Sequence, residues 1–345
     1  MSDAQPGNDR PGPDQASPDQ PGRDQPGHDQ ALRGGGVTQP AGPTAYRAGF
    51  ACIVGRPNAG KSTLTNALVG SKVAITSSKP QTTRHAIRGI RTTDDYQLIL
   101  VDTPGLHRPR TLLGQRLNDL VRETLLDVDV IGFCLPADQR PGPGDAFIAS
   151  DLADLQRARR VPVVALATKS DAVDRQRLAE HLIAIDQLGT WDAIVPCSAV
   201  KGDRVEEVAE ELASYLPASP KLYPDDVLTD EPTVVMIAEL VREAALEGVR
   251  DELPHSLAVV VEEILPREER PVDRPLTDVR VNIFVERPSQ KAIIIGKGGS
   301  RLREVGAQAR AGIEEIIGHK VFLDLHVKVL KEWQRDPKML GRLGF

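Results

Sequence analysis

The sequence predicts an α/β domain built on a doubly wound, mostly parallel sheet, followed by a smaller α+β domain. Between residues 46 and 216, apolar strand-like runs alternate with helical segments, the order typical of parallel sheets. After the short run Pro217-Ala218-Ser219-Pro220, the order becomes helix, strand, strand, helices and strand. We therefore expect a tail over residues 1–45, the α/β domain at 46–216, a linker at 217–230 and the α+β domain at 231–345.

The elements of both domains follow from apolar periodicity. In the first domain we expect strands at 49–54, 87–92, 97–102, 128–135, 161–168 and 194–197, and helices at 61–68, 112–125, 145–157, 175–188 and 205–215. The runs 98–101 and 161–166 are apolar on both faces, as buried parallel strands require. The turn Thr93-Asp94-Asp95 makes the second strand antiparallel to the third. The second domain should hold a helix at 232–247 and strands at 256–264, 278–286 and 321–331.

Composition narrows the class of protein. Eight of the 27 prolines lie in the first 43 residues, among Gly, Asp and Gln and almost nothing apolar, so we expect a disordered, dispensable tail. The net charge of −6 means that any surface binding nucleic acid is local. Three scattered cysteines predict buried thiols in a reducing compartment. No apolar run approaches the roughly 18–20 residues that span a bilayer, and no signal peptide is evident, so we expect a cytoplasmic protein.

The most specific motif is Gly55-Arg56-Pro57-Asn58-Ala59-Gly60-Lys61-Ser62, which reads G-x-x-x-x-G-K-S. It follows an apolar strand and precedes a helix, the context of a phosphate-binding loop. Glycines let successive N–H groups point inward at a helix N-terminus that favours anions. Lys61 is expected to reach the β- and γ-phosphates, and the Ser62 hydroxyl to ligate Mg²⁺.

A second motif, Asp102-Thr103-Pro104-Gly105, follows a buried strand. We expect Asp102 to support the Mg²⁺ ion and the Gly105 N–H to contact the γ-phosphate. Between the two motifs, Gln81-Thr82-Thr83-Arg84 offers a threonine hydroxyl that completes the Mg²⁺ shell when a triphosphate is present, which would make this loop a switch. We favour Thr83 over Thr82 for that role. An ordinary solvent-facing loop is the alternative.

The identity of the nucleotide base is predicted by the motif Thr168-Lys169-Ser170-Asp171, which lies at the end of a buried strand. The Asp171 carboxylate accepts hydrogen bonds from the ring N–H and exocyclic amine of guanine, and adenine lacks that donor pair. The Lys169 stem should lie over the base, and Ser198-Ala199-Val200-Lys201 should supply N–H groups for the guanine oxygen. The expected nucleotide-binding residues are Gly55, Arg56, Pro57, Asn58, Ala59, Gly60, Lys61, Ser62, Thr63, Asp102, Thr103, Pro104, Gly105, Leu106, Thr168, Lys169, Ser170, Asp171, Ser198, Ala199 and Val200.

In this order the motifs resemble those of TRAFAC-class GTPases, in which Mg²⁺, GTP and GDP bind. Two positions depart from that pattern. Thr168 replaces an asparagine that bridges neighbouring loops, so we expect weaker nucleotide affinity with guanine selectivity intact. Leu106 stands where Ras-like GTPases carry a water-orienting glutamine. In the related bacterial families Asn58 helps to bind K⁺, so we expect K⁺-stimulated hydrolysis. The expected catalytic residues are Asn58, Lys61, Thr83 and Gly105, and the metal ligands are Ser62, Thr83 and Asp102.

In the second domain, Ile293-Ile294-Ile295-Gly296-Lys297-Gly298-Gly299-Ser300 fits the I-I-G-x-x-G loop with which KH domains hold about four nucleotides of single-stranded RNA. The order of elements matches a type II KH fold. Residues 287–345 carry 12 Lys/Arg against 6 Asp/Glu. Phe284 and Phe322 are predicted to be core residues, and the role of Trp333 stays open. The expected RNA-binding residues are Lys291, Gly296, Lys297, Gly298, Gly299, Arg301 and Arg303.

A single GTPase domain joined to a type II KH domain resembles the Era family of bacterial ribosome-assembly GTPases. The resemblance covers residues 46–345 and includes Lys79-Pro80-Gln81-Thr82-Thr83-Arg84-His85, Leu253-Pro254-His255-Ser256 and Leu325-His326-Val327-Lys328-Val329. It implies a monomer that binds small-subunit rRNA near its 3′ end, assists 30S subunit maturation and associates peripherally with the inner face of the cell membrane.

Other functions fit parts of the pattern. A tRNA-modifying GTPase would end in a cysteine-bearing motif, whereas this chain ends Arg342-Leu343-Gly344-Phe345. A tandem-GTPase assembly factor would need a second phosphate loop. An ATP-dependent kinase is disfavoured by Asp171. A membrane-associated signalling GTPase whose C-terminal module binds a protein remains open.

Overall fold

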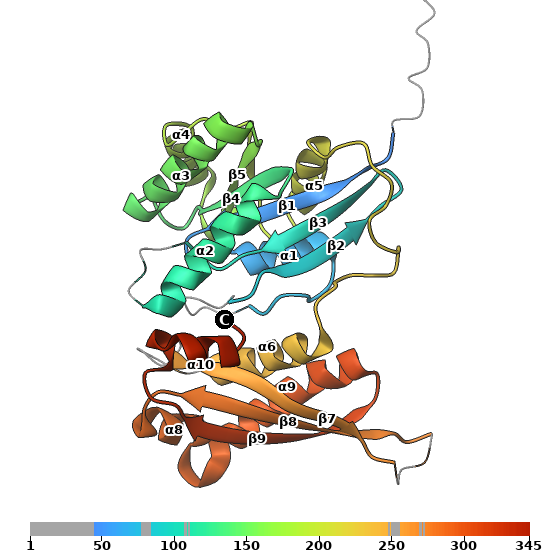
Figure 1. The fold of residues 1–345 in the computed structure, drawn as a ribbon. Coiled ribbons are helices and arrows are strands. Elements are labelled where there is room, and N and C mark those ends of the chain that lie inside the picture. The colour runs from blue at the N-terminus through green and yellow to red at the C-terminus, as the bar shows by residue number, and fades with distance from the viewer. Residues whose placement is uncertain are drawn as a thin grey trace, which may run out of the picture. The chain divides into compact units, whose positions relative to one another are not determined.

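The computed structural model describes residues 45–76, 84–106, 109, 111–247, 249, 256–268, 271 and 273–345. A six-stranded sheet with the order β2-β3-β1-β4-β5-β6 forms the first domain (Figure 1). Its strands are β1 (Arg47–Gly55), β2 (Ile87–Thr92), β3 (Tyr96–Asp102), β4 (Val130–Pro136), β5 (Val163–Thr168) and β6 (Ala193–Pro196). Only β2 runs antiparallel to its neighbour among the described strands of this sheet, so five carboxyl ends meet at one edge.

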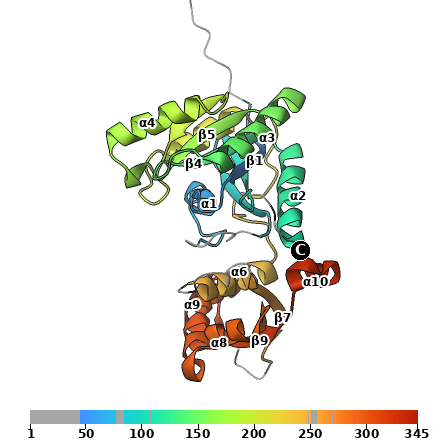
Figure 2. The same ribbon diagram turned by 90° about the vertical axis from the view of Figure 1, so that its left-hand side faces the viewer.

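Helices cover both faces of this sheet (Figures 1 and 2). Helices α1 (Lys61–Val69) and α5 (Val205–Ser214) pack on one face through residues such as Leu64 and Leu212. Helices α2 (Leu112–Leu126), α3 (Pro143–Arg159) and α4 (Arg175–Asp186) pack on the other through Val121, Ile148 and Ile185. The doubly wound α/β prediction is confirmed.

The second domain is a three-stranded sheet of order β7-β8-β9. Strand β7 (Ala258–Pro266) is antiparallel to β8 (Leu276–Val285), which is parallel to β9 (Lys320–Val329). Helices α6 (Thr233–Leu246), α8 (Pro288–Ile295) and α9 (Ser300–Ile317) share one apolar core with these strands (Figure 2). A short helix α10 (Pro337–Arg342), absent from the prediction, follows β9. This arrangement is the predicted α+β domain.

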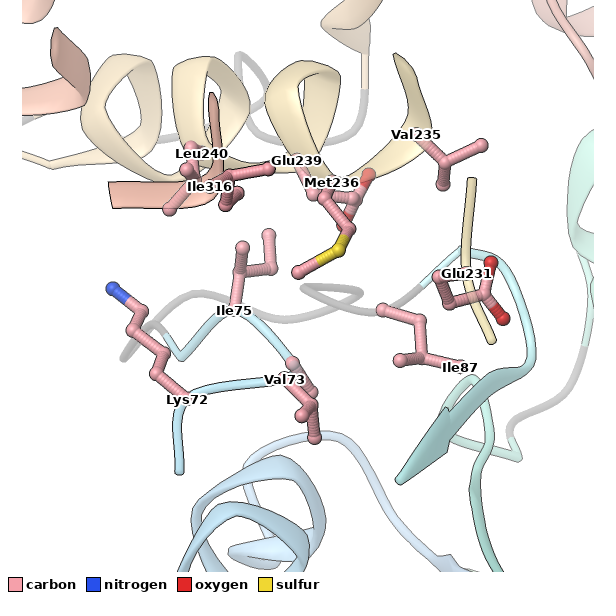
Figure 3. A pocket seen from close by; sticks show the side chains of 11 residues that line it. Lys72, Val73, Ile75, Ile87, Glu231, Val235, Met236, Glu239, Leu240 and Ile316 are labelled. Carbon is pink, nitrogen blue, oxygen red and sulfur yellow. The ribbon is translucent and has the colours of Figure 1, made fainter. Parts of the chain in front are cut away.

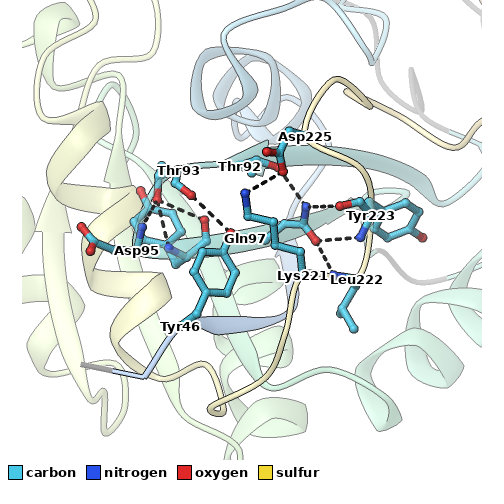
Figure 4. Close-up of polar contacts among 10 residues, drawn as sticks. Tyr46, Thr92, Thr93, Asp95, Gln97, Lys221, Leu222, Tyr223 and Asp225 are labelled. Atoms are coloured by element: carbon cyan, nitrogen blue, oxygen red, sulfur yellow. Dashed lines mark hydrogen bonds and ion pairs between the residues drawn. The ribbon is translucent and has the colours of Figure 1, made fainter. Parts of the chain in front are cut away.

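The predicted linker is bound to the first domain at the β2–β3 edge. Gln97, on β3, is fully buried, and its side-chain oxygen accepts from the main-chain N–H groups of Leu222 at 2.7 Å and Tyr223 at 2.9 Å (Figure 4). Its amide donates to the Tyr223 carbonyl, and the N–H of Ile90, on β2, donates to the Leu228 carbonyl at 2.8 Å. These hydrogen bonds to the buried Gln97 side chain hold the linker around Leu222 and Tyr223 in place. Residues 217–230 therefore follow the sheet edge.

Each predicted element boundary lies within two residues of the observed one. One aromatic residue, Phe322, corrects the sequence interpretation, and a second, Trp333, has a position that the sequence left open. Phe322, predicted in the core, is 51% exposed because β9 turns its neighbours Val321 and Leu323 toward the helices. Trp333 is fully buried and donates from its indole to the Ser256 carbonyl at 3.1 Å, so it does not stack on a base. The predictions for residues 1–44 lie outside the described residues.

The three cysteines are free and buried, as predicted. Burial raises the pKa of each thiol, that of Cys197 to about 12. Each is therefore protonated at neutral pH and packs as a small apolar side chain.

Candidate functional site

The phosphate loop joins β1 to α1 at the carboxyl edge of the sheet. Gly60 has φ 90° and precedes the first residue of α1, so the free N–H groups of that helix open into the loop. Asn58, at the loop tip, also has positive φ, 63°. A Cβ on Gly55 would lie 2.8 Å from the Cys134 carbonyl oxygen, so only glycine fits there. This backbone forms an anion-binding cradle.

Lys61 lies inside this cradle. Its side chain is buried, and Nζ donates to the carbonyl of Arg56 at 3.2 Å. Burial lowers the pKa of Lys61, while the Asp102 carboxylate acts in the opposite direction. A buried ammonium attracts an anion more strongly than an exposed one does, because burial strengthens electrostatic attraction. The lysine is therefore placed to donate hydrogen bonds to phosphate oxygens, as predicted from the motif.

Two predicted metal ligands meet directly. Ser62 Oγ, in the first turn of α1, donates to Asp102 Oδ2 at 2.6 Å. Asp102 ends β3 and is fully buried. A hydroxyl and a carboxylate oxygen this close suit Mg²⁺, which prefers oxygen ligands and usually completes its shell with phosphates and water. Within the described residues, no group of three or more His, Cys, Asp or Glu could hold a metal by itself. Thr82 and Thr83 lie outside the described residues.

The segment after Asp102 packs against the phosphate loop. A Cβ on Gly105 would lie 2.7 Å from the backbone nitrogen of Pro57, so glycine permits this close approach. The N–H of Leu106 donates to the Gly55 carbonyl at 3.3 Å. The Leu106 side chain is buried in the apolar cluster that includes Val121 and Leu125 of α2. It therefore points away from any attacking water.

Thr168 makes the loop-bridging contact that its position predicts. Its Oγ1, at the end of β5, donates to the Ala59 carbonyl of the phosphate loop at 2.7 Å, and the bond is buried. The Thr168 hydroxyl thus joins the base-binding loop to the phosphate loop. An asparagine at this position would offer two polar groups for the same task.

The base-recognition residues come together at the ends of β5 and β6. Ser198 Oγ donates to Asp171 Oδ1 at 2.5 Å, and the same hydroxyl accepts from the Lys201 N–H at 3.1 Å. Lys169 has φ 57° and pairs with Asp138 at 3.0 Å. Asp171 is exposed and fixed in orientation by Ser198, as a carboxylate that reads a base edge must be. The structure thus places all the predicted nucleotide-binding residues that it describes at one edge of the sheet, in loops and in the adjoining ends of strands and of α1.

The G-x-x-G loop lies between α8 and α9. Gly296 has φ 72°, and a Cβ there would meet the Arg301 backbone nitrogen at 2.8 Å, whereas the space around Gly298, at φ 59°, is open. Arg303 donates to the Gly298 carbonyl at 3.0 Å, and Lys297 is exposed. The Gly296–Gly299 backbone is thus accessible to a phosphate chain. Lys291 is half-buried on α8.

Arg301 makes its described bonds within the second domain. Its guanidinium donates to the carbonyls of Ala244 and Glu247 at the end of α6 and pairs with Glu304 at 2.7 Å. Those bonds hold the loop against α6, and RNA contact by Arg301 stays a prediction. Ile293, one turn before the loop, is 54% exposed.

Comparison with known proteins agrees with both domains. A family model described as "50S ribosome-binding GTPase" matches residues 50–169, and one described as "KH domain" matches residues 252–334. GTPase Era of Streptomyces coelicolor is 65% identical over 307 residues, covering 88% of this chain and 96% of its own length. GTPase Era of Mycobacterium tuberculosis H37Rv is 62% identical over 303 residues, covering 88% and 100%.

Solved structures agree as well. Era in complex with MgGDPNP and nucleotides 1506–1542 of 16S ribosomal RNA superposes with a TM-score of 0.81 at 36% identity, covering 87% of this chain and 99% of that one. A variant of Aquifex aeolicus Era bound to GDP·AlF4⁻ gives 0.80 at 36% identity, covering 86% and 99%. From its motifs, its two domains and these likenesses, this chain belongs to the Era family of GTPases.

Proposed function

We propose that this protein is a GTP-hydrolysing switch that binds small-subunit ribosomal RNA near its 3′ end and assists maturation of the 30S subunit. The observation that carries the proposal is the pairing, in one chain, of a guanine-type nucleotide site with an open G-x-x-G loop. A relative at 36% identity has been solved with a GTP analogue and a 16S rRNA segment, which supports the choice of RNA. The likenesses over almost the whole length disfavour the tRNA-modifying and signalling alternatives.

In this proposal each group in the nucleotide site has one task. The loop N–H groups and Lys61 hold the β- and γ-phosphates, and Asp171 accepts the guanine protons. Ser62 and Asp102 would hold Mg²⁺, which when bound would supply positive charge to neutralise the phosphates. Since the Leu106 side chain is buried, the attacking water must be oriented by another group.

Contacts beside the predicted switch loop, Gln81-Thr82-Thr83-Arg84, support coupling to the RNA-binding domain. Before it, the N–H of Thr76 donates to Glu243 of α6 at 2.9 Å, and Lys72 pairs with the same carboxylate at 2.5 Å. At the last residue of this loop, Arg84 Nη1 donates to the Leu257 carbonyl, just before β7, at 2.6 Å. If triphosphate orders this loop, the change would therefore reach the KH domain through the contacts with Glu243 and Leu257.

Apolar contacts lie beside these bonds. Val73, Ile75 and Ile87 of the GTPase domain face Met236 and Leu240 of α6 across a small pocket (Figure 3). In a separate cluster, α2 contributes Leu113 and Leu117, which pack with Trp333 and the C-terminal helix. Helix α2, which follows the Asp102–Gly105 motif in the chain, therefore contacts the RNA-binding domain. A two-state rearrangement of such packed surfaces is the usual basis of a switch.

We further propose that K⁺ stimulates hydrolysis through Asn58. Its left-handed backbone conformation places it at the tip of the phosphate loop, and a monovalent cation there would compensate for the missing water-orienting glutamine. Turnover measured in KCl and NaCl of equal ionic strength tests this. Faster hydrolysis in KCl, lost in Asn58→Ala, is expected. Equal rates in the two salts would contradict the proposal.

The proposed location is the cytoplasm, with peripheral contact at the inner face of the membrane, and the proposed state is a monomer. Among the described helices none has the length and apolar character to cross a bilayer. Flotation with anionic-lipid vesicles tests the membrane contact, and sedimentation equilibrium tests the monomer.

The nucleotide assignment is tested by Asp171→Asn. An amide presents a donor where the carboxylate accepts, which suits xanthine, whose second oxygen replaces the amino group of guanine. The variant should lose GTP hydrolysis and gain XTP hydrolysis. Unchanged GTP turnover would show that Asp171 does not read the base.

A further inference from the structure

The phosphate loop is attached to helix α3 by one buried carboxylate. Arg56 Nε, in the loop, donates to Asp145 Oδ1 at 2.6 Å. The Asp145 side chain is fully buried, whereas that of Arg56 is 27% exposed. The other oxygen, Asp145 Oδ2, accepts from the Gly142 N–H at 2.8 Å, at the N-terminus of α3. One carboxylate oxygen therefore accepts a hydrogen bond at the N-terminus of α3, and the other accepts one from the phosphate loop.

The backbone of Arg56 is as constrained as its side chain. Its carbonyl accepts from Lys61 Nζ and from the Ala59 N–H, each at 3.2 Å. Gly144, next to Asp145 on α3, leaves room for the arginine stem, because a Cβ there would lie 2.8 Å from Arg56 Cδ. Arg56 thus connects α3 to the lysine that the proposed function assigns to the phosphates.

We propose that Asp145 is a positioning residue for GTP hydrolysis, acting through Arg56 on Lys61 and on the tip of the phosphate loop. The inference rests on the GTPase activity of the site and adds α3 to the elements that set its geometry. Stabilising the end of α3 needs only the bond to Gly142, so a helix cap alone does not account for the second oxygen. A buried carboxylate that holds a loop through a charge-assisted bond fixes both distance and direction.

Two variants of equal length isolate the bond. In glutamine, Nε2 stands at the position of arginine Nε, so Arg56→Gln keeps the donor to Asp145. Methionine has the same length and no donor, so Arg56→Met removes the bond while leaving Asp145 and its contact with Gly142 in place. Arg267 provides a matched control in the other domain, because its Nε donates to Asp278 Oδ1 at 2.7 Å.

The experiment measures kcat and KM for GTP, GDP affinity and thermal unfolding for the full chain, with assays well below the melting temperature. We expect Arg56→Gln to keep kcat within about threefold, and Arg56→Met to lower it by on the order of 10-fold or more with a smaller change in KM. Arg267→Gln and Arg267→Met should hydrolyse GTP equally.

Equal kcat values for Arg56→Gln and Arg56→Met would overturn the inference. If Arg56→Met then had only a lower melting temperature, the bond between Arg56 and Asp145 would contribute to stability and not to hydrolysis. In the background of Asp145→Ala the two arginine variants should become equal. A difference that persists there would mean that Arg56 acts on the nucleotide directly, which also contradicts the inference. Absence of GTP hydrolysis by the unaltered protein would instead overturn the proposed function.

Discussion

Arg84 is bonded across the two domains to Leu257, its Nη1 donating to the main-chain oxygen at 2.6 Å. The side chain is fully buried, with its guanidinium 5.7 Å from the Trp333 ring centroid and 5.8 Å from that of Phe345. Burial lowers the pKa of Arg84 to about 9, with Arg242 acting in the same direction and Glu239 against it, so the group stays charged at neutral pH. A buried cation of this kind depends on its acceptors and aromatic partners.

Arg84→Met is therefore expected to loosen the contact between the domains. Loss of one hydrogen bond from a charged donor costs about 1.5–3 kcal/mol. RNA affinity should then no longer depend on whether GTP or GDP is bound, while kcat changes little. Anisotropy of a labelled RNA with each nucleotide measures this. Arg122→Met, on the exposed surface of α2, is the control. A variant at position 84 that kept the full nucleotide dependence would contradict the coupling route.

His85 predicts a pH dependence of the same contact. Its ring stacks on Phe345 with centroids 5.3 Å apart. Burial lowers the pKa of His85 from 6.5, Glu239 opposes that shift, and Arg242 and Arg84 add to it. Because the unfolded state binds the proton more tightly, the contribution of His85 is full above pH 6.5 and is lost as pH falls through the window below it.

The free energy of unfolding, measured by urea titration between pH 5 and 8, should show this loss in the unaltered protein. His85→Phe keeps an aromatic ring against Phe345 and removes the titrating group. Its stability should fall less between pH 7 and pH 5 than that of the unaltered protein. Identical pH profiles for the two proteins would rule out a titrating role for His85.

Thr168 predicts a graded effect on nucleotide affinity. Thr168→Val has the same shape but cannot donate to the Ala59 carbonyl. Leaving that buried acceptor unpaired costs about 1–3 kcal/mol, so GDP affinity should fall at least fivefold. Thr168→Asn restores a donor and the usual family residue, and it should bind GDP at least as tightly as the unaltered protein. Titration calorimetry with GDP decides, and a valine variant with unchanged affinity would show that the hydroxyl bridge is dispensable.

Most of this site could be predicted because its chemistry is local in sequence. The phosphate loop, the Asp102–Gly105 motif and Asp171 each follow an apolar strand, and parallel strands bring their carboxyl ends to one edge. Arg84, Asp145 and Gln97 could not be identified in this way. The long-range bonds described above join residues that are 89 positions apart for Asp145, 173 for Arg84, and 125 and 126 for Gln97. No local sequence pattern encodes such distant partners.

The position of Phe322 was mispredicted because its apolar character was weighed above the alternation of β9. In that strand Phe322 shares a face with Lys320, Asp324, His326 and Lys328, and it faces outward, where Arg267 lies 5.3 Å from its ring centroid. Trp333 is buried by α2 and α10, elements whose packing depends on the meeting of the two domains.

Gly298 predicts a separation of the two activities. Its φ of 59° is one that Asn and Asp tolerate, and the space beside it is open. Gly298→Asp adds a negative charge where phosphates are expected, so RNA affinity should fall by 10-fold or more while GTP turnover stays near normal. Gly298→Asn has nearly the same shape without the charge and should bind RNA more tightly than the aspartate variant. Equal RNA affinity of all three proteins would remove this loop from the RNA site.

The central claim is that the nucleotide bound to the first domain controls the affinity of the second domain for RNA. The most direct measurement is the Kd of the full-length protein for an oligonucleotide from the 3′ end of 16S rRNA, with GDPNP and then with GDP, both in Mg²⁺ and at one fixed salt concentration. The account predicts at least 10-fold tighter binding with GDPNP. The same Kd with both nucleotides would contradict it.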